Sequence, residues 1–191
     1  MISDEQIALQ ITSENQISAI NAKLTEISDI NSVFEPNDID LRRSKKFQYT
    51  SNSLLILFKH HVLEEKLIGN VLQILSKTFE LKIINVAFVK LTLDEASKLL
   101  SVYRETIPNI SNSIAYICSN NNLALQVEIK LKGEQDVEIS QIFDQFQLVV
   151  GPYCPKTAKE IASDTVRGLF GQSIIKNVIH VTEFEEDREY E

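Results

Sequence analysis

The stretch GPYCPKTAKEIASDTVRGLFGQSIIKNVIHVTE, residues 151–183, is the densest run of turn formers and phosphate-compatible side chains in the chain. Three of the five glycines and two of the four prolines lie within it. A loop that opens with Gly-Pro and closes on a short helix presents backbone N–H groups that suit an anion. Arg167, in a Thr-Val-Arg-Gly turn, adds a planar fork of donors that fits phosphate oxygens.

His180 follows Arg167 by thirteen residues and comes directly after an apolar pair. A histidine held in one tautomer can attack a phosphoryl group, so His180 is a candidate nucleophile. A lone histidine after apolar residues is also typical of a half-buried side chain without a catalytic role. Spacing alone favours the second interpretation, and only the order of the whole segment favours the first.

That order resembles the signature of the nucleoside diphosphate kinase family. The family signature runs Gly-x-Thr-x-Pro, then Thr-Ile-Arg-Gly and, after a short gap, Arg-Asn-x-Ile-His-Gly-Ser-Asp. The corresponding residues here are Gly151-Pro-Tyr-Cys-Pro155, Thr165-Val-Arg-Gly168 and Lys176-Asn-Val-Ile-His-Val-Thr-Glu183. The Gly-Pro opening and the His-x-Thr-Glu ending are more similar to the divergent, cilium-associated branch of the family than to the housekeeping enzymes.

The resemblance extends over about residues 52–187. The segment 57–62 stands where the family has Ile-Lys-Pro-Asp-Gly-Val, and the segments 116–119 and 123–128 resemble its Tyr-Met-x-Ser and Val-Ala-Met-Val-x-Glu. The nearest likeness is to the second kinase-like domain of the two-domain ciliary members, which are found with doublet microtubules. The resemblance therefore implies partners in a ciliary, axonemal or microtubule assembly.

The chemistry that the resemblance implies is phosphoryl transfer through a phosphorylated histidine at His180. Such a transfer needs an in-line nucleophile and positive charge around the equatorial oxygens. The implied ligand is a magnesium-bound nucleotide (ATP, GTP or a nucleoside diphosphate), and no separate metal site is expected. The implied nucleotide- and phosphate-binding positions are Lys59, Tyr103, Thr165, Arg167 and Asn177, with Thr182 as a supporting hydroxyl.

Three departures from the family pattern bear on activity. Gln147 replaces a second phosphate-binding arginine, and Tyr153 replaces a threonine that contacts phosphate. His60 and His61 stand where the family has Pro-Asp, so we expect a different turn after Lys59. One fixed donor or cation in such a site is worth about 2.7–4 kcal/mol, so losing two would slow the reaction roughly 10⁴-fold.

We therefore expect a kinase-fold protein with a degraded nucleotide site, kept mainly as an interaction subunit of a ciliary or microtubule assembly. The alternative, which the retained His180 favours, is an active or weakly active nucleoside diphosphate kinase. A regulatory subunit that binds nucleotide without turnover is a third hypothesis. All three rest on analogy between family members.

Composition sets bounds on these hypotheses. The chain has 191 residues, 43% of them hydrophobic, which is enough to bury a core. Its net charge of −8 argues against general electrostatic binding to the phosphates of nucleic acid. No apolar run is long enough to cross a membrane and no charged-then-apolar stretch stands near residue 1, so we expect neither a membrane span nor a secretory leader. Cys118 and Cys154 are too few for a disulfide or zinc framework, so we expect a reducing compartment: cytoplasm, cytoskeleton or cilium.

Residues 1–50 are expected to be an appendage to a domain over 51–191. Isoleucine and leucine recur there at spacings of three and four, which predicts a helix with a narrow apolar stripe. The stripe consists of Ile17, Ile20, Leu24 and Ile27. A seam against a helix of a partner protein and a helix folded back on its own domain both fit this pattern. The basic cluster 42–46 is typical of a solvated linker, and contact with an acidic surface is the less common alternative.

Within the domain, apolar runs and helical periodicity alternate. The predicted elements are a strand over 54–58, a helix over 64–78, a strand over 81–91, a helix from 92, a short helix over 110–118, a strand over 123–131, and a helix over 137–146 that leads into the signature loop and a last strand. This order predicts an α+β ferredoxin-like sandwich with an N-terminal helical extension.

Overall fold

A computed structural model describes residues 53–134 and 137–182. The helix and basic linker predicted over residues 1–50 lie outside these ranges.

The described residues form one antiparallel sheet of four strands in the order β2-β3-β1-β4. The strands are β1 (Ser53–Phe58), β2 (Phe79–Val89), β3 (Asn122–Leu131) and β4 (Ile179–Val181). β1 lies inside the sheet and pairs antiparallel with both β3 and β4. Its run of Leu, Ile and Phe is buried along most of its length, as expected of a strand covered on both faces. The predicted ferredoxin-like α+β sandwich is confirmed.

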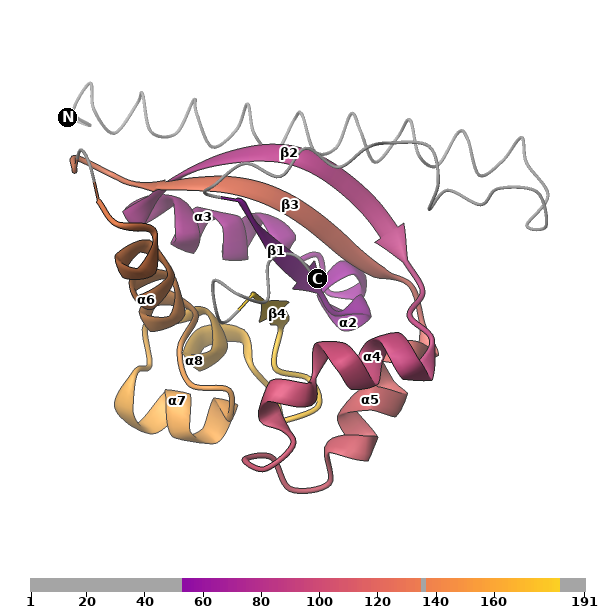
Figure 1. Cartoon of the computed structure of the whole chain (residues 1–191). Coiled ribbons are helices and arrows are strands. Elements are labelled where there is room, and N and C mark those ends of the chain that lie inside the picture. The colour runs from indigo at the N-terminus through magenta and orange to yellow at the C-terminus, as the bar shows by residue number, and fades with distance from the viewer. Residues whose placement is uncertain (1–52, 135–136, 183–191) are drawn as a thin grey trace. The chain divides into compact units, whose positions relative to one another are not determined.

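The helices among the described residues pack against the faces of this sheet (Figure 1). They are α2 (His60–Glu64), α3 (Ile68–Thr78), α4 (Leu93–Leu99), the 3₁₀ turn η1 (Ser101–Tyr103), α5 (Ile110–Ser119), α6 (Ile139–Val150), α7 (Pro155–Ile161) and α8 (Val166–Phe170). α4 and α5 pack on the face of β1 that carries Leu57, where Ala96 and Ile117 form a buried cluster with it. Phe146 of α6 packs on Phe79 at the start of β2, with ring centroids 5.2 Å apart.

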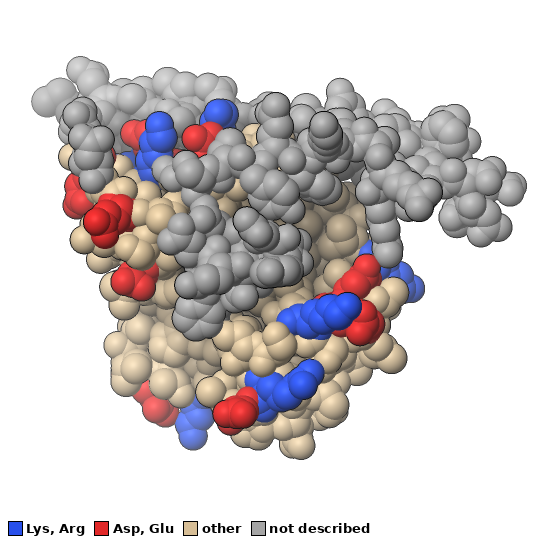
Figure 2. Space-filling view, viewed as in Figure 1, with Lys and Arg blue, Asp and Glu red and all other residues tan. Residues whose placement is uncertain are grey.

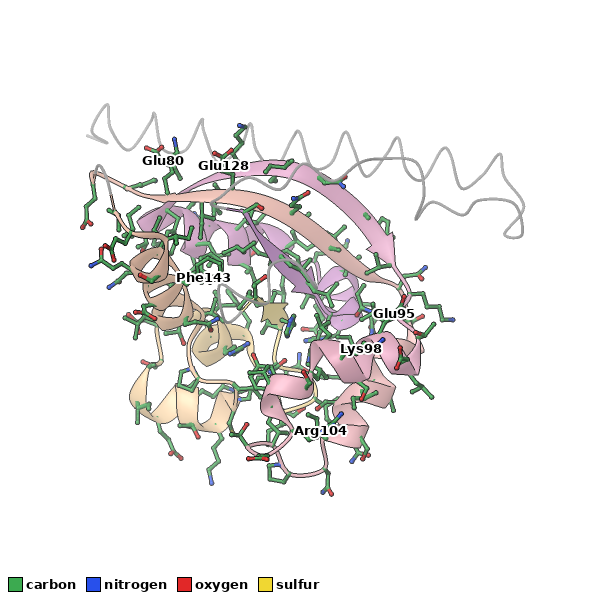
Figure 3. The ribbon with its side chains drawn as sticks, in the orientation of Figure 1. Glu80, Glu95, Lys98, Arg104, Glu128 and Phe143 are labelled. Carbon is green, nitrogen blue, oxygen red and sulfur yellow. The ribbon has the colours of Figure 1, made fainter. Side chains whose placement is uncertain are left out.

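Charged side chains mark the outer side of the sheet. Lys82 on β2 bonds to Glu128 on β3 at 3.0 Å across the two strands. Figure 3 shows Glu80 and Glu128 on the side of the sheet away from α3, whereas Phe143 of α6 lies on the same side as α3. Lysine, arginine and acidic side chains are interspersed on the face seen in Figure 2, rather than gathered by sign.

The prediction of one helix over 64–78 is wrong at its start. The chain forms α2 immediately after Lys59, ends it at Glu64 and begins α3 only at Ile68. Lys66 takes a left-handed conformation with φ 58°, which no regular helix can accommodate. The amide of Leu67 then donates to the carbonyl of Val62, and this bond closes the turn between the two helices.

The helix start predicted at Thr92 is confirmed in its detail. The Thr92 hydroxyl accepts a bond from the Glu95 amide at 3.3 Å, and the Glu95 carboxylate accepts one from the Thr92 amide at 2.8 Å. This reciprocal pair is a capping box. It follows the end of β2 at Val89, so the strand occupies 79–89 and not the predicted 81–91.

Two glycines shape the signature loop. Gly151, which ends α6, has φ 85°, and a Cβ there would collide with the Thr165 side chain. A Cβ on Gly168 would lie 2.5 Å from the Ala162 carbonyl oxygen. Both positions therefore exclude other residues, and they let α6, α7 and α8 close tightly around Thr165.

Candidate functional site

His180 lies in the middle of β4, directly opposite Leu57 of β1, and is 1% exposed. Opposed residues of an antiparallel pair share a face, so His180 points to the side of the sheet that α4 and α5 cover. The ring of Tyr103, from η1, meets the His180 ring edge-on at a centroid distance of 6.2 Å. Two residues that the sequence places in the site are therefore adjacent.

A strained turn precedes His180. The Ile179 amide donates to the Asn177 carbonyl at 3.1 Å across Val178, whose φ is 78°. Positive φ is rare for a β-branched residue and costs on the order of 1–3 kcal/mol. The Lys59 amide donates to the Val178 carbonyl at 3.1 Å and so braces the turn from the end of β1. The direction of the His180 side chain is consequently fixed by two segments.

Lys59 is fully buried, and its Nζ donates to the carbonyl of Ile175 at 2.9 Å. Burial, and after it the nearby charge of Arg167, lower the pKa of Lys59 from 10.5 to about 7. No carboxylate accompanies this amine among the bonds that the described residues make to it. At neutral pH the Lys59 amine is thus protonated in only part of the molecules.

Arg167 lies on α8 and is 1% exposed. Its Nη1 donates to the Gly151 carbonyl at 2.9 Å and its Nη2 to the Ile179 carbonyl at 3.3 Å. The guanidinium therefore joins the start of the signature loop to β4. Its Nε hydrogen has no acceptor among the described residues.

The ring of Tyr153 lies among these groups. Its centroid is 4.2 Å from that of Tyr103, 5.1 Å from Cζ of Arg167 and 5.8 Å from Nζ of Lys59. The Tyr153 carbonyl accepts a bond from Nδ2 of Asn177 at 3.2 Å. One aromatic side chain therefore touches two cations and one positioning tyrosine from three separate elements.

The remaining predicted positions bind the backbone. The Thr165 hydroxyl caps α8: it accepts from the Gly168 amide at 3.2 Å and donates to the Ala162 carbonyl at 2.7 Å. The Thr182 hydroxyl accepts from the Leu55 amide at 2.9 Å. Nε2 of Gln147 donates to the Thr182 carbonyl at 3.2 Å, so this side chain reaches the end of β4 without bringing a charge.

Two buried histidines adjoin Lys59. His60 and His61 begin α2 and pack on Tyr116, with ring centroids 4.2 and 5.9 Å from that of the tyrosine. Burial first, and then the charge of Lys59, lower the pKa of His61 to about 4. The sequence predicted an altered turn after Lys59, but the aromatic cluster gave no signal of its own, because Tyr116 lies far along the chain.

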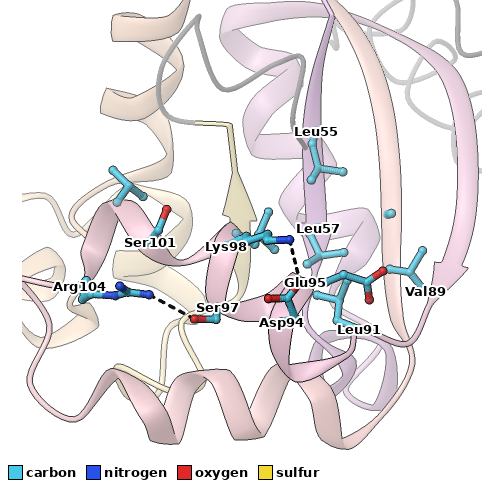
Figure 4. A pocket seen from close by; sticks show the side chains of 13 residues that line it. Leu55, Leu57, Val89, Leu91, Asp94, Glu95, Ser97, Lys98, Ser101 and Arg104 are labelled. Carbon is cyan, nitrogen blue, oxygen red and sulfur yellow. Dashed lines mark hydrogen bonds and ion pairs between the residues drawn. The ribbon is translucent and has the colours of Figure 1, made fainter.

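A cavity of 890 Å³ lies elsewhere, between α4 and the sheet (Figure 4). Its floor is aliphatic and includes Leu55 and Leu57, and its rim carries Lys98, paired with Asp94 at 2.7 Å. None of the predicted site residues lines it. The cluster around Tyr153 and this cavity are therefore separate features.

The nucleoside diphosphate kinase family model matches residues 51–191. The chain belongs to this family. Its domain is 24% identical over 140 residues to mouse nucleoside diphosphate kinase homolog 7, covering 72% of this chain and 32% of the mouse protein. It is 28% identical over 137 residues to the nucleoside diphosphate kinase of Thermoplasma acidophilum, covering 72% of this chain and 82% of that one. This kinase-family chain thus spans about a third of the mouse protein's length.

Solved nucleoside diphosphate kinases share the fold of this family member. The Aquifex aeolicus enzyme superposes with a TM-score of 0.56 at 23% identity, covering 73% of this chain and 90% of the other. The Encephalitozoon cuniculi enzyme gives a TM-score of 0.56 at 21% identity, with 73% and 84% covered. At this level of identity the likeness shows the fold.

Neither a metal cluster nor a membrane helix is found in the described part of the chain. Over 53–134 and 137–182, no three His, Cys, Asp or Glu side chains converge as metal ligands. In the same ranges, no helix has the length and apolarity to cross a bilayer.

Proposed function

We propose that this chain is a nucleoside diphosphate kinase-like domain with a reduced phosphate site, which acts mainly as an interaction subunit of a ciliary or microtubule-associated assembly. The observation that carries the first part is the position of the Tyr153 ring, within 6 Å of both Lys59 and Arg167. A polyphosphate would need the space that this ring fills. The residues present therefore fit a polyphosphate poorly in this conformation.

The hydrogen bonds of the two cations support the same proposal. Lys59 and Arg167 donate to three backbone carbonyls, those of Ile175, Gly151 and Ile179. A phosphate would have to compete with these bonds, and each buried carbonyl that lost its donor would carry a desolvation penalty. Both cations thus act as internal braces of the fold.

The second arginine of the family pattern is absent, and Gln147 bonds to a backbone carbonyl in its place. The site lacks the full charge that an arginine would add beside Arg167. Since electrostatic stabilisation is usually the largest single term in phosphoryl transfer, we expect turnover to be slow.

The assembly role is supported by the likeness to the cilium-associated branch and by residues 1–50, which precede the part that the family model matches. We propose that this segment docks the domain onto a protein of a ciliary, axonemal or microtubule assembly. The corresponding location is the cytoplasm and cytoskeleton, including the cilium or axoneme. Nucleotide is a secondary ligand in this proposal, and neither nucleic acid nor a membrane is a partner.

A second candidate function is favoured by one observation: His180 is retained, buried and braced by the turn at Val178. In an active enzyme a ring nitrogen of His180 would attack the γ-phosphorus of a magnesium-bound triphosphate. The bond from that phosphorus to the β–γ bridging oxygen would break, and the diphosphate would leave. A second nucleoside diphosphate would then take the phosphoryl group from His180 by the reverse step.

Incubating the full chain with magnesium and γ-labelled ATP distinguishes the two functions. A reduced site predicts acid-labile labelling far below one phosphate per chain, measured against an active nucleoside diphosphate kinase under identical conditions. Near-stoichiometric labelling that His180→Ala removes would overturn the proposal and establish the kinase.

A further inference from the structure

We propose that Tyr153 is the gate of the phosphate site: its ring occupies the space in front of Lys59 and Arg167, and a phosphate-bearing ligand contacts these cations only after the ring has left. This inference rests on the proposed function, because it concerns the same site. It attributes the low phosphate affinity that we expect to the side chain of Tyr153, which a substitution can remove.

The ring contacts come from three directions. Lys59 follows β1, Tyr103 belongs to η1, and Arg167 lies on α8. Within the described residues the ring of Tyr153 touches all three. A cation over an aromatic face is attracted by the ring quadrupole, more strongly when water is excluded. The ring therefore takes over part of the stabilisation that an anion would otherwise give to two buried cations.

The backbone on either side of the ring is held. The Tyr153 carbonyl is bound by Asn177, and the carbonyl of Gly151, two residues earlier, is bound by Arg167. Gly168 and Thr165 close the loop from the other side. Because the backbone is held on both sides, opening in this proposal occurs by rotation of the Tyr153 side chain.

Such a gate lowers affinity by a definite rule. When only a fraction of molecules has the ring rotated out, the apparent dissociation constant is the intrinsic value divided by that fraction. Removing the ring removes this factor, whereas removing only the hydroxyl leaves the ring and its contacts with Lys59 and Arg167 in place. Tyr153→Ala and Tyr153→Phe are therefore a matched pair of variants, since alanine removes the ring without adding the hydroxyl that the family pattern has at this position.

The test is calorimetric titration of the full chain with inorganic tripolyphosphate and with ADP, below pH 7 so that Lys59 is charged. Tyr153→Ala is expected to bind both ligands about tenfold more tightly than the wild type, and Tyr153→Phe to gain nothing. Equal affinity of Tyr153→Ala and wild type, or absence of binding in both, overturns the gate. An equal gain in Tyr153→Phe does so as well, because the ring would then not be the barrier.

A measurement on the wild type covers the case in which Tyr153→Ala fails to fold. With ¹³C-labelled tyrosine, tripolyphosphate should shift the ring signals of Tyr103 and Tyr153 together, because their 4.2 Å ring contact is lost. Binding that leaves both signals in place contradicts the gate. Near-stoichiometric phosphorylation of His180 in the wild type would refute the proposed function separately, since labelling does not depend on the ratio of the variants' affinities.

Discussion

The guanidinium carbon of Arg167 lies 5.1 Å from the centre of the Tyr153 ring. The same guanidinium binds the carbonyls of Gly151 and Ile179, so it connects the start of the signature loop to the strand that carries His180. An arginine that the family pattern assigns to phosphate is here a buried brace of the fold. Its loss should therefore be visible in stability before it is visible in catalysis.

Replacing this brace should destabilise the domain. Arg167→Met keeps the length of the side chain but leaves two buried carbonyls without their donors, so we expect a loss of about 2–4 kcal/mol in the free energy of unfolding. Arg104→Met is the matched control, because Arg104 is exposed and bonds only to Ser97 among the hydrogen bonds described for it. We expect that control to change stability by less than about 0.5 kcal/mol. Urea unfolding of both variants is the measurement, and equal midpoints would refute the bracing role.

Lys59 should make phosphate binding depend on pH. Its pKa in the folded chain is about 7, against 10.5 without burial. Above pH 7 an anionic ligand must bind together with a proton on Lys59, so affinity should fall by up to about tenfold per pH unit. Titrating tripolyphosphate at pH 8 in buffers of different ionisation enthalpy measures that proton uptake. Lys59→Met should abolish it; uptake that persists in this variant would assign the proton elsewhere.

The lowered pKa of Lys59 also affects the stability of the fold. Stability should rise with pH, whereas phosphate affinity should fall. Between pH 7 and 10.5 the unfolded chain binds more protons at Lys59 than the folded chain does, so the Lys59 contribution to stability rises with pH. Unfolding midpoints at pH 7.5 and 9, compared between wild type and Lys59→Met, measure this. The wild type should gain stability relative to Lys59→Met as pH rises. A constant difference would mean that the amine is charged in the folded state throughout.

His61, one of the two buried histidines beside Lys59, should make the domain less stable in acid. The pKa of His61 is lowered from 6.5 to about 4 by burial and by Lys59, with Glu65 opposing and His60 and Lys176 adding to the effect. Between pH 6.5 and 4 the unfolded chain binds the extra proton, so stability should fall as pH falls, by up to about 1.4 kcal/mol per unit. Urea midpoints across this window should fall more steeply for the wild type than for His61→Leu. Equal slopes would show that His61 is not the titrating group.

Restoring the missing charge should partly restore the site. Gln147→Arg places a cation near the end of β4, where the Gln147 amide now bonds to the Thr182 carbonyl. If the new charge reaches a phosphate, affinity for ADP should improve by about 1.5–3 kcal/mol. Calorimetry on Gln147→Arg, Tyr153→Ala and the double variant gives a full cycle. Gln147→Glu is the control, and improved binding in that variant would exclude a charge effect.

Residues 1–50 should matter for assembly and not for the stability of the kinase-like domain. A chain lacking them should melt at a temperature similar to that of the full chain, yet fail to co-sediment with purified doublet microtubules. Replacing Ile20 and Leu24 by aspartate in the full chain should have the same effect, because it charges the predicted apolar stripe. Unfolding or precipitation of the shortened chain would instead show that the segment completes the domain.

Much of this fold was predictable because its signals are local. The helix start at Thr92 and the apolar strand β1 depend on neighbouring residues, and both predictions are confirmed. The signature segment predicted the family, which the family model shows. The break at Lys66 escaped prediction because a left-handed lysine has no sequence marker comparable to glycine.

The functional role of the candidate residues stays a prediction, but the structure shows how they are placed. Contacts with Tyr153 or with one another link Lys59, Tyr103, Arg167, Asn177 and His180. Their bonding partners could not be inferred from the sequence. Lys59 bonds to a carbonyl 116 residues away, and such pairings are decided by tertiary packing. The sequence indicated that Tyr153 replaces a threonine that contacts phosphate in the family. In the structure the ring of Tyr153 lies against the guanidinium of Arg167.

The strained turn at Val178 has a consequence for engineering. Its left-handed conformation is held by the Lys59 amide and by the bond between Asn177 and Ile179, both of which are independent of a bound nucleotide. The turn that positions the candidate nucleophile His180 and the side chains around Tyr153 are therefore separable parts of this domain. A designer seeking to build a phosphotransferase from this domain could leave β4 untouched and change only Tyr153 and Gln147.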